Sequence, residues 1–232
     1  MSVEYTPPLS SGCNDHWSWN EGDKSHEVYL YGFKQNIAFF HPNWSNSTAG
    51  VRGTKSLNGG RFYWEIKISQ RIFGTSMMFG IGTKKARLHV DGFVNMLGED
   101  INSWGMSHKG LLWHGGKYRQ YTKPFQKNVA TTIGVFFDGL EGTLTFYKDN
   151  ICLGVAFNNL QKINEPLYPM VCSTAAKTEM MLGVLKRDFI SLQDRCRASI
   201  LTCITQEQQM DNLQLPVSLK KDILEGMVDF KN

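Results

Sequence analysis

Short runs of alternating apolar and polar residues constrain this fold more than any other feature of the sequence. In residues 61–68 every second side chain is large and apolar: Phe62, Trp64, Ile66 and Ile68. Glu65 and Lys67 lie on the opposite face, and Asn58-Gly59-Gly60 before the run is a strong turn signal. The run therefore predicts a β-strand with one buried face and one face in water.

Residues 131–137, 143–147 and 151–157 follow the same pattern and are separated by turn-forming residues. In the last run one face carries four apolar side chains: Ile151, Leu153, Val155 and Phe157. Eight or more such strands in about 170 residues predict an antiparallel β-sandwich. No helical stretches intervene, which disfavours a doubly wound α/β fold.

The periodicity changes near Lys186. Leu192, Cys196 and Ile200 are spaced at i, i+4 and i+8, which indicates an amphipathic helix. A second amphipathic helix is expected to begin near Ser218. Two short helices cannot bury their apolar faces between themselves, so we expect them to dock on the sandwich, on a partner, or on both.

The charge and hydropathy exclude several classes of partner. The chain has 25 Lys and Arg against 21 Asp and Glu, and its longest basic runs are pairs such as Lys84-Lys85, which does not indicate a nucleic-acid-binding surface. Residues 1–12 lack the apolar core and basic start of a signal peptide, and no stretch is long and apolar enough to span a membrane. We expect a soluble protein of the cytoplasm, the nucleus or both, with no membrane partner.

The cysteines and histidines form no recognisable framework. Five cysteines are an odd number and none lies in a Cys-x-x-Cys pair, so we expect reduced thiols, no disulfide framework and no structural zinc. The six histidines are dispersed without helical metal-ligand spacing. We predict neither a metal site nor a cofactor.

Catalytic motifs are also absent from the sequence. There is no Gly-x-Ser-x-Gly elbow, no P-loop, no Gly-x-Gly-x-x-Gly opening a helix and no His-Glu-x-x-His. His114, beside Trp113 and Gly115, is interpreted as a turn histidine near an aromatic strand, with a general base as the alternative. Asp138 and Asp149 look like turn formers. We predict no catalytic residue and no enzyme.

Several runs in the β region resemble the SPRY domain, a bent β-sandwich that recognises peptides and proteins. They are Gly50-Val51-Arg52-Gly53, Phe62-Tyr63-Trp64-Glu65-Ile66, Met78-Phe79-Gly80-Ile81-Gly82, Ser103-Trp104-Gly105, residues 138–154 and Tyr168-Pro169-Met170-Val171. Each run alone is a weak signal, but their order and spacing are specific. The resemblance implies a mainly β, SPRY-like fold of the concanavalin-like jelly-roll kind.

The tail resembles a SOCS box, and the chain thus resembles the SPRY domain-containing SOCS box proteins over nearly its whole length, closest to the type 3 members. Leu192, Cys196 and Ile200 match the elongin-binding pattern Leu-x-x-x-Cys-x-x-x-aliphatic. The implied cullin-binding residues are Leu213, Leu215, Pro216 and Leu219. We expect an N-terminal tail (residues 1–15), a SPRY domain (16–187) and a small C-terminal helical SOCS box (188–232).

The cullin box departs from the family pattern Leu-Pro-Leu-Pro. Gln214 replaces the first proline, and Asp222 stands where an aromatic residue often occurs. Proline pre-organises the entry to the second helix and glutamine does not, so this departure predicts weaker engagement of a cullin.

The resemblance implies a non-catalytic substrate-receptor subunit of a cullin-RING ubiquitin ligase. Its implied partners are elongin C and elongin B, cullin-5 with its RING partner, and a target protein that carries a short Asn-containing degron. The target would be ubiquitinated and degraded by the proteasome.

The resemblance also implies a peptide-binding surface of loops at one end of the sandwich. Its residues are Pro42, Trp44, Gly74, Thr75, Phe93, Met96, Thr174, Ala175 and Ala176. Backbone groups of Gly74 and of the Thr174 loop would bond an Asn amide, with Phe93 and Met96 covering its apolar side. Relatives that bind acidic Asn-run peptides carry Tyr at Phe93 and Trp-Gly at 175–176, so we expect different ligands here.

Two other functions fit the sequence. One is a scaffold that binds partners without degrading them, which the altered cullin box favours. The other is a lectin, in which Trp44, Trp104 and Trp113 would stack on sugar rings; the expected reduced cysteines and the helical tail speak against it.

Overall fold

The computed structural model describes residues 8–9, 12–188, 196, 200, 203–204, 209, 213–217 and 219–220. The chain divides into two units, one of residues 1–10 and 14–187 and one of residues 11–13 and 188–232. None of the helices among the described residues has the length and apolarity needed to cross a membrane.

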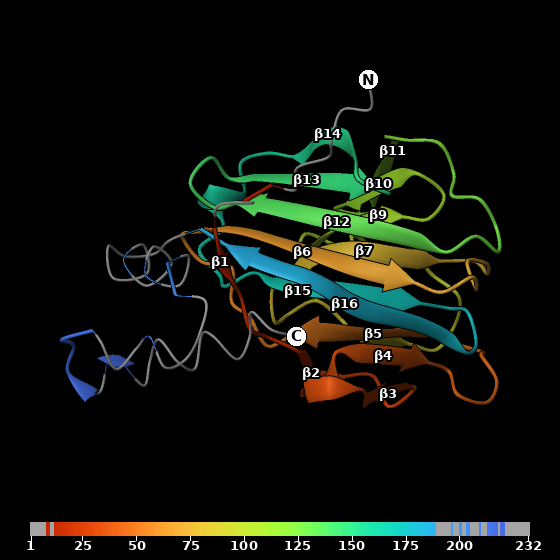
Figure 1. Cartoon of the computed structure of the whole chain (residues 1–232). Coiled ribbons are helices and arrows are strands. Elements are labelled where there is room, and N and C mark those ends of the chain that lie inside the picture. The colour runs from red at the N-terminus through yellow and green to blue at the C-terminus, as the bar shows by residue number, and fades with distance from the viewer. Residues whose placement is uncertain are drawn as a thin grey trace, which may run out of the picture. The chain divides into compact units, whose positions relative to one another are not determined.

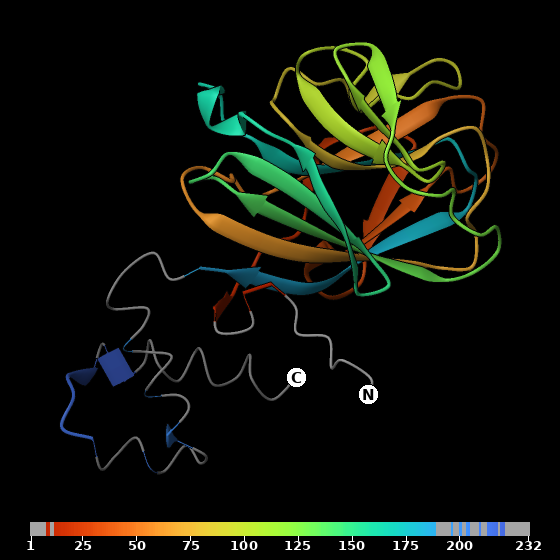
Figure 2. The same cartoon turned by 90° about the horizontal axis from the view of Figure 1, so that it is seen from above.

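The first unit is built from two antiparallel sheets (Figures 1 and 2). The first sheet runs in the order β14 (Ile151–Phe157), β13 (Thr143–Lys148), β12 (Thr131–Asp138), β6 (Arg61–Ile68), β16 (Thr178–Arg187), β4 (Ile37–Phe40) and β3 (Val28–Tyr31), with β1 (Cys13–Asn14) beside β16. The second runs in the order β11 (Lys117–Gln120), β10 (Leu111–His114), β9 (Ser103–Ser107), β7 (Met77–Gly82), β15 (Tyr168–Ser173), β5 (Thr48–Gly53) and β2 (Trp19–Lys24), with β8 (His89–Val90) beside β5. The first unit also has two short 3-10 turns, η1 (Phe33–Gln35) and η2 (Leu160–Lys162). The prediction of an antiparallel β-sandwich is confirmed.

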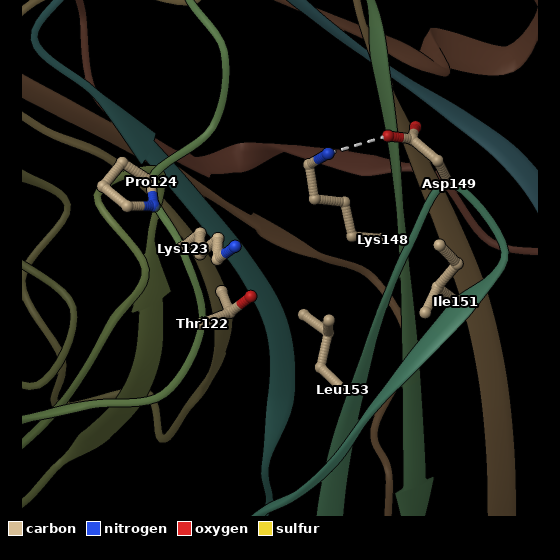
Figure 3. Close-up of a pocket in the computed structure, with 7 residues that line it drawn as sticks. All are labelled: Thr122, Lys123, Pro124, Lys148, Asp149, Ile151 and Leu153. Carbon is tan, nitrogen blue, oxygen red and sulfur yellow. Dashed lines mark hydrogen bonds and ion pairs between the residues drawn. The ribbon is translucent and has the colours of Figure 1, made fainter.

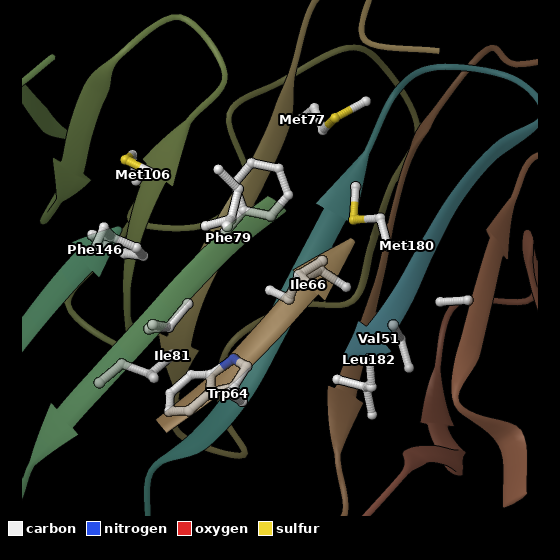
Figure 4. Close-up of a cluster of buried hydrophobic side chains, with 14 of the residues drawn as sticks. Val51, Trp64, Ile66, Met77, Phe79, Ile81, Met106, Phe146, Met180 and Leu182 are labelled. Atoms are coloured by element: carbon white, nitrogen blue, oxygen red, sulfur yellow. The ribbon is translucent and has the colours of Figure 1, made fainter. Parts of the chain in front are cut away.

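The core lies between the inner faces of the two sheets. Figure 4 shows Trp64 and Ile66 of β6 and Phe79 and Ile81 of β7 in one buried cluster. The four apolar residues predicted to share a face of residues 61–68 are all buried. Alternation along β6 therefore predicted which side chains meet the opposite sheet.

The predicted wet face of β6 is wrong at Glu65, which is only 7% exposed. Its cross-strand neighbour in β12 is Gly134, and β16 carries a register shift beside it around Gly183. Glu65 accepts hydrogen bonds from the Tyr63 hydroxyl (3.1 Å) and the Val184 amide (3.4 Å). Two glycines thus leave room for a carboxylate that the irregular backbone of β16 helps to satisfy.

The predicted buried face of residues 151–157 is also wrong in part. β14 lies at the edge of its sheet, and Ile151 is 67% and Val155 50% exposed. Register shifts along its pairing with β13 mark the strand as irregular. An alternating pattern is the same for an edge strand and a central one, so the sequence could not distinguish them.

The turn predictions hold where the structure describes them. Asp138 Oδ1 accepts the amides of Leu140 and Glu141, and Asp149 Oδ1 accepts the amide of Thr132. His114 ends β10, stacks on Trp104 with 4.6 Å between ring centroids, and is 2.9 Å through Nδ1 from the Ser103 carbonyl. Each of these three side chains thus makes its contacts with other groups of the sandwich.

A buried arginine ties three parts of the second sheet together. Arg52 of β5 is 1% exposed, and its guanidinium donates to Asp23 of β2 and to the carbonyl of Ala86 (2.6 Å). The planar guanidinium has several N–H donors and bonds β2 and the loop of Ala86 at the same time, whereas the ammonium group of a lysine could not.

Replacing this arginine tests its contribution. We expect Arg52→Met to lower the free energy of unfolding by about 3 kcal/mol, because it leaves the Asp23 carboxylate and the Ala86 carbonyl without their donor. Arg61→Met is the matched control: Arg61 pairs with Asp138 but its side chain is 38% exposed, so a loss below about 1 kcal/mol is expected. Chemical denaturation measures both, and equal losses would refute a special role for Arg52.

His108 follows β9 and is 7% exposed. Its backbone amide donates to the Met77 carbonyl (2.8 Å), and its Nδ1 lies 3.4 Å from the same oxygen. Burial lowers the pKa of His108 below its ordinary value, because the charged imidazolium is poorly solvated there.

This burial predicts a pH dependence of stability. The unfolded chain binds the proton at the ordinary pKa near 6.5 and the folded chain only at lower pH, so the free energy of unfolding falls as the pH drops below about 7. We expect His108→Gln to reduce that fall between pH 7.5 and 5.5 relative to the parent protein. His26→Gln, which removes an imidazole from a side chain that is 72% exposed, is the control for the loss of a histidine. Parallel profiles for the parent and His108→Gln would contradict the prediction.

Candidate functional site

A pocket of about 240 Å³ opens where four connections of the sandwich meet. Its lining residues are Trp44, Ser45, Phe73, Gly74, Thr75, Phe93, Thr174, Ala175 and Ala176. They come from the segments between β4 and β5, β6 and β7, β8 and β9, and β15 and β16. We call this site the Trp44 pocket.

Most residues predicted for the peptide surface come together here. Trp44, Gly74, Thr75, Phe93, Thr174, Ala175 and Ala176 all line the Trp44 pocket. Pro42 is half-buried and does not line it. Ser45 and Phe73 line it but were missed; each is adjacent to a predicted residue, which is the signal that could have included them.

Met96 is placed differently from its prediction. It is 1% exposed and packs in a second buried cluster with Met78, Met170 and Cys172. Its side chain therefore cannot cover the apolar side of a ligand, and the prediction for this residue is wrong. The unbranched, flexible side chain of methionine readily fills a gap in a core, which explains its inward position here.

Hydrogen bonds around Thr174 join the segment between β15 and β16 to the segments between β4 and β5 and between β6 and β7. The Thr174 amide donates to the Ser76 carbonyl (2.9 Å), and Thr174 Oγ1 accepts the Ser76 amide (2.9 Å). Ser45 Oγ donates to the Thr174 carbonyl at 2.6 Å. The Ala175 amide donates to Ser173 Oγ. These groups of the Thr174 loop already make hydrogen bonds within the protein, so they are not open to a ligand as the family resemblance implies.

Gly74 supplies backbone that a larger residue would block. Its φ is +92°, and an added Cβ would lie 3.2 Å from both Ala175 Cβ and Thr174 Oγ1. Glycine therefore allows the left-handed turn and the close approach of the two loops.

Further hydrogen bonds hold the aromatic residues of the rim. Thr48 Oγ1 donates to the Gly92 carbonyl (2.7 Å) and accepts the Val94 amide (3.0 Å), which fixes the backbone on both sides of Phe93. His41 is fully buried, and its Nε2 lies 3.0 Å from the Ser173 carbonyl. The loop that carries Trp44 is thus tied to the end of β15.

The chemistry of the Trp44 pocket is apolar and uncharged. Trp44 is 81% and Phe93 49% exposed, and the lining includes no charged side chain. Arg71 lies close by, with its guanidinium 5.1 Å from the Phe73 ring centroid. Such a surface fits an uncharged or apolar segment of a ligand. It does not gather the tryptophans of the lectin alternative, since Trp104 is 4% exposed and lies outside the pocket.

In the described part of the chain, no group of three or more His, Cys, Asp and Glu residues is arranged to hold a metal ion. Cys152, Cys172, Cys196 and Cys203, all in the described part of the chain, form no disulfide bond. Burial raises the pKa of the Cys172 thiol to about 12, which makes it a core residue rather than a nucleophile.

The predicted tail residues are described only in part. Leu192 lies outside the described residues. Cys196 and Ile200 are both helical, and the amide of Ile204 donates to the carbonyl of Ile200 at 3.1 Å, an i to i−4 bond. Of the cullin-box residues, Leu213, Leu215 and Leu219 are half-buried and Pro216 is exposed.

Comparison with known proteins identifies the family. Residues 61–184 match the family described as the SPRY domain. SPRY domain-containing SOCS box protein 3 of Xenopus tropicalis is 38% identical over 208 residues, covering 88% of this chain and 56% of that protein. The human SPRY domain-containing SOCS box protein 1 is 30% identical, covering 94% and 84%. Protein gustavus of Drosophila melanogaster is 32% identical, covering 94% and 82%.

Solved structures show the same fold at low identity. The TRIM65 PSpry domain matches with a TM-score of 0.58 and 20% identity, over 72% of this chain and 89% of that one. The SPRY domain of human HERC1 matches with a TM-score of 0.56 and 14% identity, over 73% and 98%. The SPRY-like fold predicted from the sequence is confirmed.

The chain spans about half (56%) of the length of the type 3 relative from Xenopus tropicalis, to which it is more similar than to the human type 1 protein. The sheet architecture, the SPRY match and the shared length with the type 1 proteins agree. This chain belongs to the SPRY domain-containing SOCS box protein family.

Proposed function

We propose that this protein is a non-catalytic substrate receptor of a cullin-RING ubiquitin ligase. The Trp44 pocket would hold a short segment of a target protein, and the tail would join the rest of the ligase. The observation that carries this proposal is Trp44 itself, a large aromatic side chain left 81% exposed at the rim of a pocket whose loops are hydrogen-bonded in place. Exposed aromatic residues beside a concave site are typical anchors of recognition surfaces.

The proposed ligand is a short Asn-containing peptide. An Asn side chain needs both a donor and an acceptor, and the uncharged lining suits an amide better than a carboxylate. Gly74 offers backbone without a side chain, while Trp44 and Phe93 offer apolar contact area. The Thr174 and Ala175 amides already donate to groups of the protein, so we assign the ligand's hydrogen bonds chiefly to the backbone of the Gly74 turn.

The tail is proposed to bind elongin C, with elongin B, through Leu192, Cys196 and Ile200. The helical state of Cys196 and Ile200 supports the i, i+4, i+8 interpretation of this pattern. Leu192 and Ile200 would be aliphatic anchors, and the small Cys196 would let a partner approach closely between them.

Cullin-5 with its RING partner is the proposed scaffold, contacted by Leu213, Leu215, Pro216 and Leu219. The carbonyl of Pro216 accepts the amide of Lys220 at 3.0 Å, so a helical turn begins at this proline. Gln214 precedes it in place of the family proline, and we expect correspondingly weaker cullin binding. If cullin binding were lost altogether, the chain would act as a non-degradative scaffold.

In this function catalysis comes from other subunits. The receptor would raise the effective concentration of target lysines near the charged ubiquitin-conjugating enzyme, leading to proteasomal degradation. We place this activity in the cytoplasm, the nucleus or both.

The Trp44 pocket is tested with a peptide array. We expect the full chain to bind a subset of ten-residue peptides with a central Asn, and Trp44→Ala to weaken that binding by about tenfold or more, because an aromatic anchor is removed. Phe33→Ala removes an equally exposed aromatic side chain (78%) outside the pocket and should change nothing. Equal binding by the parent and Trp44→Ala would contradict the assignment of the site.

The tail is tested by co-purification with elongins B and C. Leu192→Ala alone should cost about 2 kcal/mol of elongin affinity, and Leu192→Ala with Cys196→Ala should abolish co-purification while leaving peptide binding intact. Cys152→Ala changes an exposed cysteine of the sandwich and serves as the control. Retention of elongins by the double variant would count against the ligase assignment.

A further inference from the structure

Basic residues gather in one stretch of the sandwich. Residues 101–137 contain five Lys and Arg and no Asp or Glu, so this stretch alone accounts for the net positive charge of the chain. The cations are Lys109, Lys117, Arg119, Lys123 and Lys127, and all are exposed. Two of them, Lys117 and Arg119, lie on β11 at the edge of the second sheet.

That edge is where β11 of the second sheet approaches β14 of the first. Arg119 donates to the Ala156 carbonyl, and the Tyr121 hydroxyl donates to the Gly154 carbonyl. These side chains occupy backbone acceptors of β14, which discourages the addition of another strand at that point. A partner at this edge would therefore contact mainly side chains.

A groove of about 430 Å³ lies beside these contacts (Figure 3). Thr122, Lys123 and Pro124 form one wall, and Ile151 and Leu153 of β14 lie across from them. Ile151 is 67% exposed, so most of its side chain is open to a partner. The groove thus pairs an aliphatic wall with a basic one.

The groove is lined by two lysines, Lys123 and Lys148, and by one carboxylate, that of Asp149. Lys148 Nζ lies 3.0 Å from Asp149 Oδ2, and Asp149 Oδ1 accepts the Thr132 amide at 2.9 Å. The one carboxylate of the lining is therefore committed to its lysine and to the turn. Within the part of the chain that the structure describes, Lys123 has no carboxylate partner, and the groove has a net positive charge.

We propose that this groove binds an acidic segment of a partner protein, one that carries an aliphatic side chain between its carboxylates. A carboxylate would pair with Lys123, and the aliphatic side chain would cover Ile151 and Leu153. The positive stretch would also steer such a segment toward this edge. The proposed site is separate from the Trp44 pocket and does not depend on the ligase function.

The lining favours a peptide over a nucleic acid. Single-stranded nucleic acids use exposed aromatic rings as stacking platforms. None lines this groove: the nearby Phe125 is 5% exposed and lies under Lys148, whose Nζ is 5.6 Å from the ring centroid.

Fluorescence anisotropy of the full chain with a labelled peptide of eight Asp and Glu residues and two Leu residues, at physiological salt, tests the proposal. We expect saturable binding that Lys123→Glu weakens by about tenfold and Ile151→Ser also weakens. Both positions are exposed, so the sandwich should stay folded. Lys34→Glu makes the same charge change on η1, beside the opposite edge of the sheet, and should have little effect. Trp44→Ala should bind the acidic peptide normally.

Several results would overturn the proposal. An equal loss in Lys34→Glu would reduce the effect to net charge. Equal binding of a peptide with Asn and Gln in place of Asp and Glu would remove the role of Lys123. Tighter binding of an oligothymidine, or no binding of the acidic peptide at all, would also refute it. A loss in Trp44→Ala would mean that the peptide occupies the Trp44 pocket instead.

Discussion

The reciprocal pairing of Thr174 with Ser76 is the contact on which the site depends. β15 pairs with β7 as far as Ser173 and Met77. Beyond these residues the Thr174 amide donates to the Ser76 carbonyl, and the Ser76 amide donates to Thr174 Oγ1, both at 2.9 Å. Ser76 is fully buried and Thr174 is 4% exposed, so these bonds do not compete with water. The sheet is in this way extended into the two loops that form the wall of the Trp44 pocket. Without that extension Gly74 and Ala175 would have no fixed separation.

Ordered loops on the sandwich would favour the peptide binding proposed for the Trp44 pocket. Binding costs less when the receptor loops are already ordered, because their conformational entropy was lost on folding. Thr48 and His41 add further ties to the Phe93 and Trp44 segments. The remaining freedom lies in exposed side chains such as Trp44.

The sequence predicted the strands that bury one face and failed where long-range neighbours decide. Phe62, Trp64 and Ile66 follow from alternation alone, whereas the burial of Glu65 depends on Gly134 and Gly183, which come from two other strands. Ile151 and Val155 show the same limit, because edge position is a property of sheet order and not of local pattern. Trp44, Gly74 and Phe93, which the family resemblance placed on one surface, line one pocket. The resemblance could not show that Met96 turns inward, or that Thr174 is hydrogen-bonded to Ser76.

Hydrogen exchange of individual amides in the native protein tests the central claim most directly, namely that the pocket is preformed by the Thr174–Ser76 pairing. The account predicts that the amides of Ser76 and Thr174 exchange as slowly as those of the adjoining strands β7 and β15, with opening free energies near that of global unfolding. Exchange of these two amides at the rate of an exposed loop, without any ligand present, would show that the loops are not held by the sheet and would contradict the account.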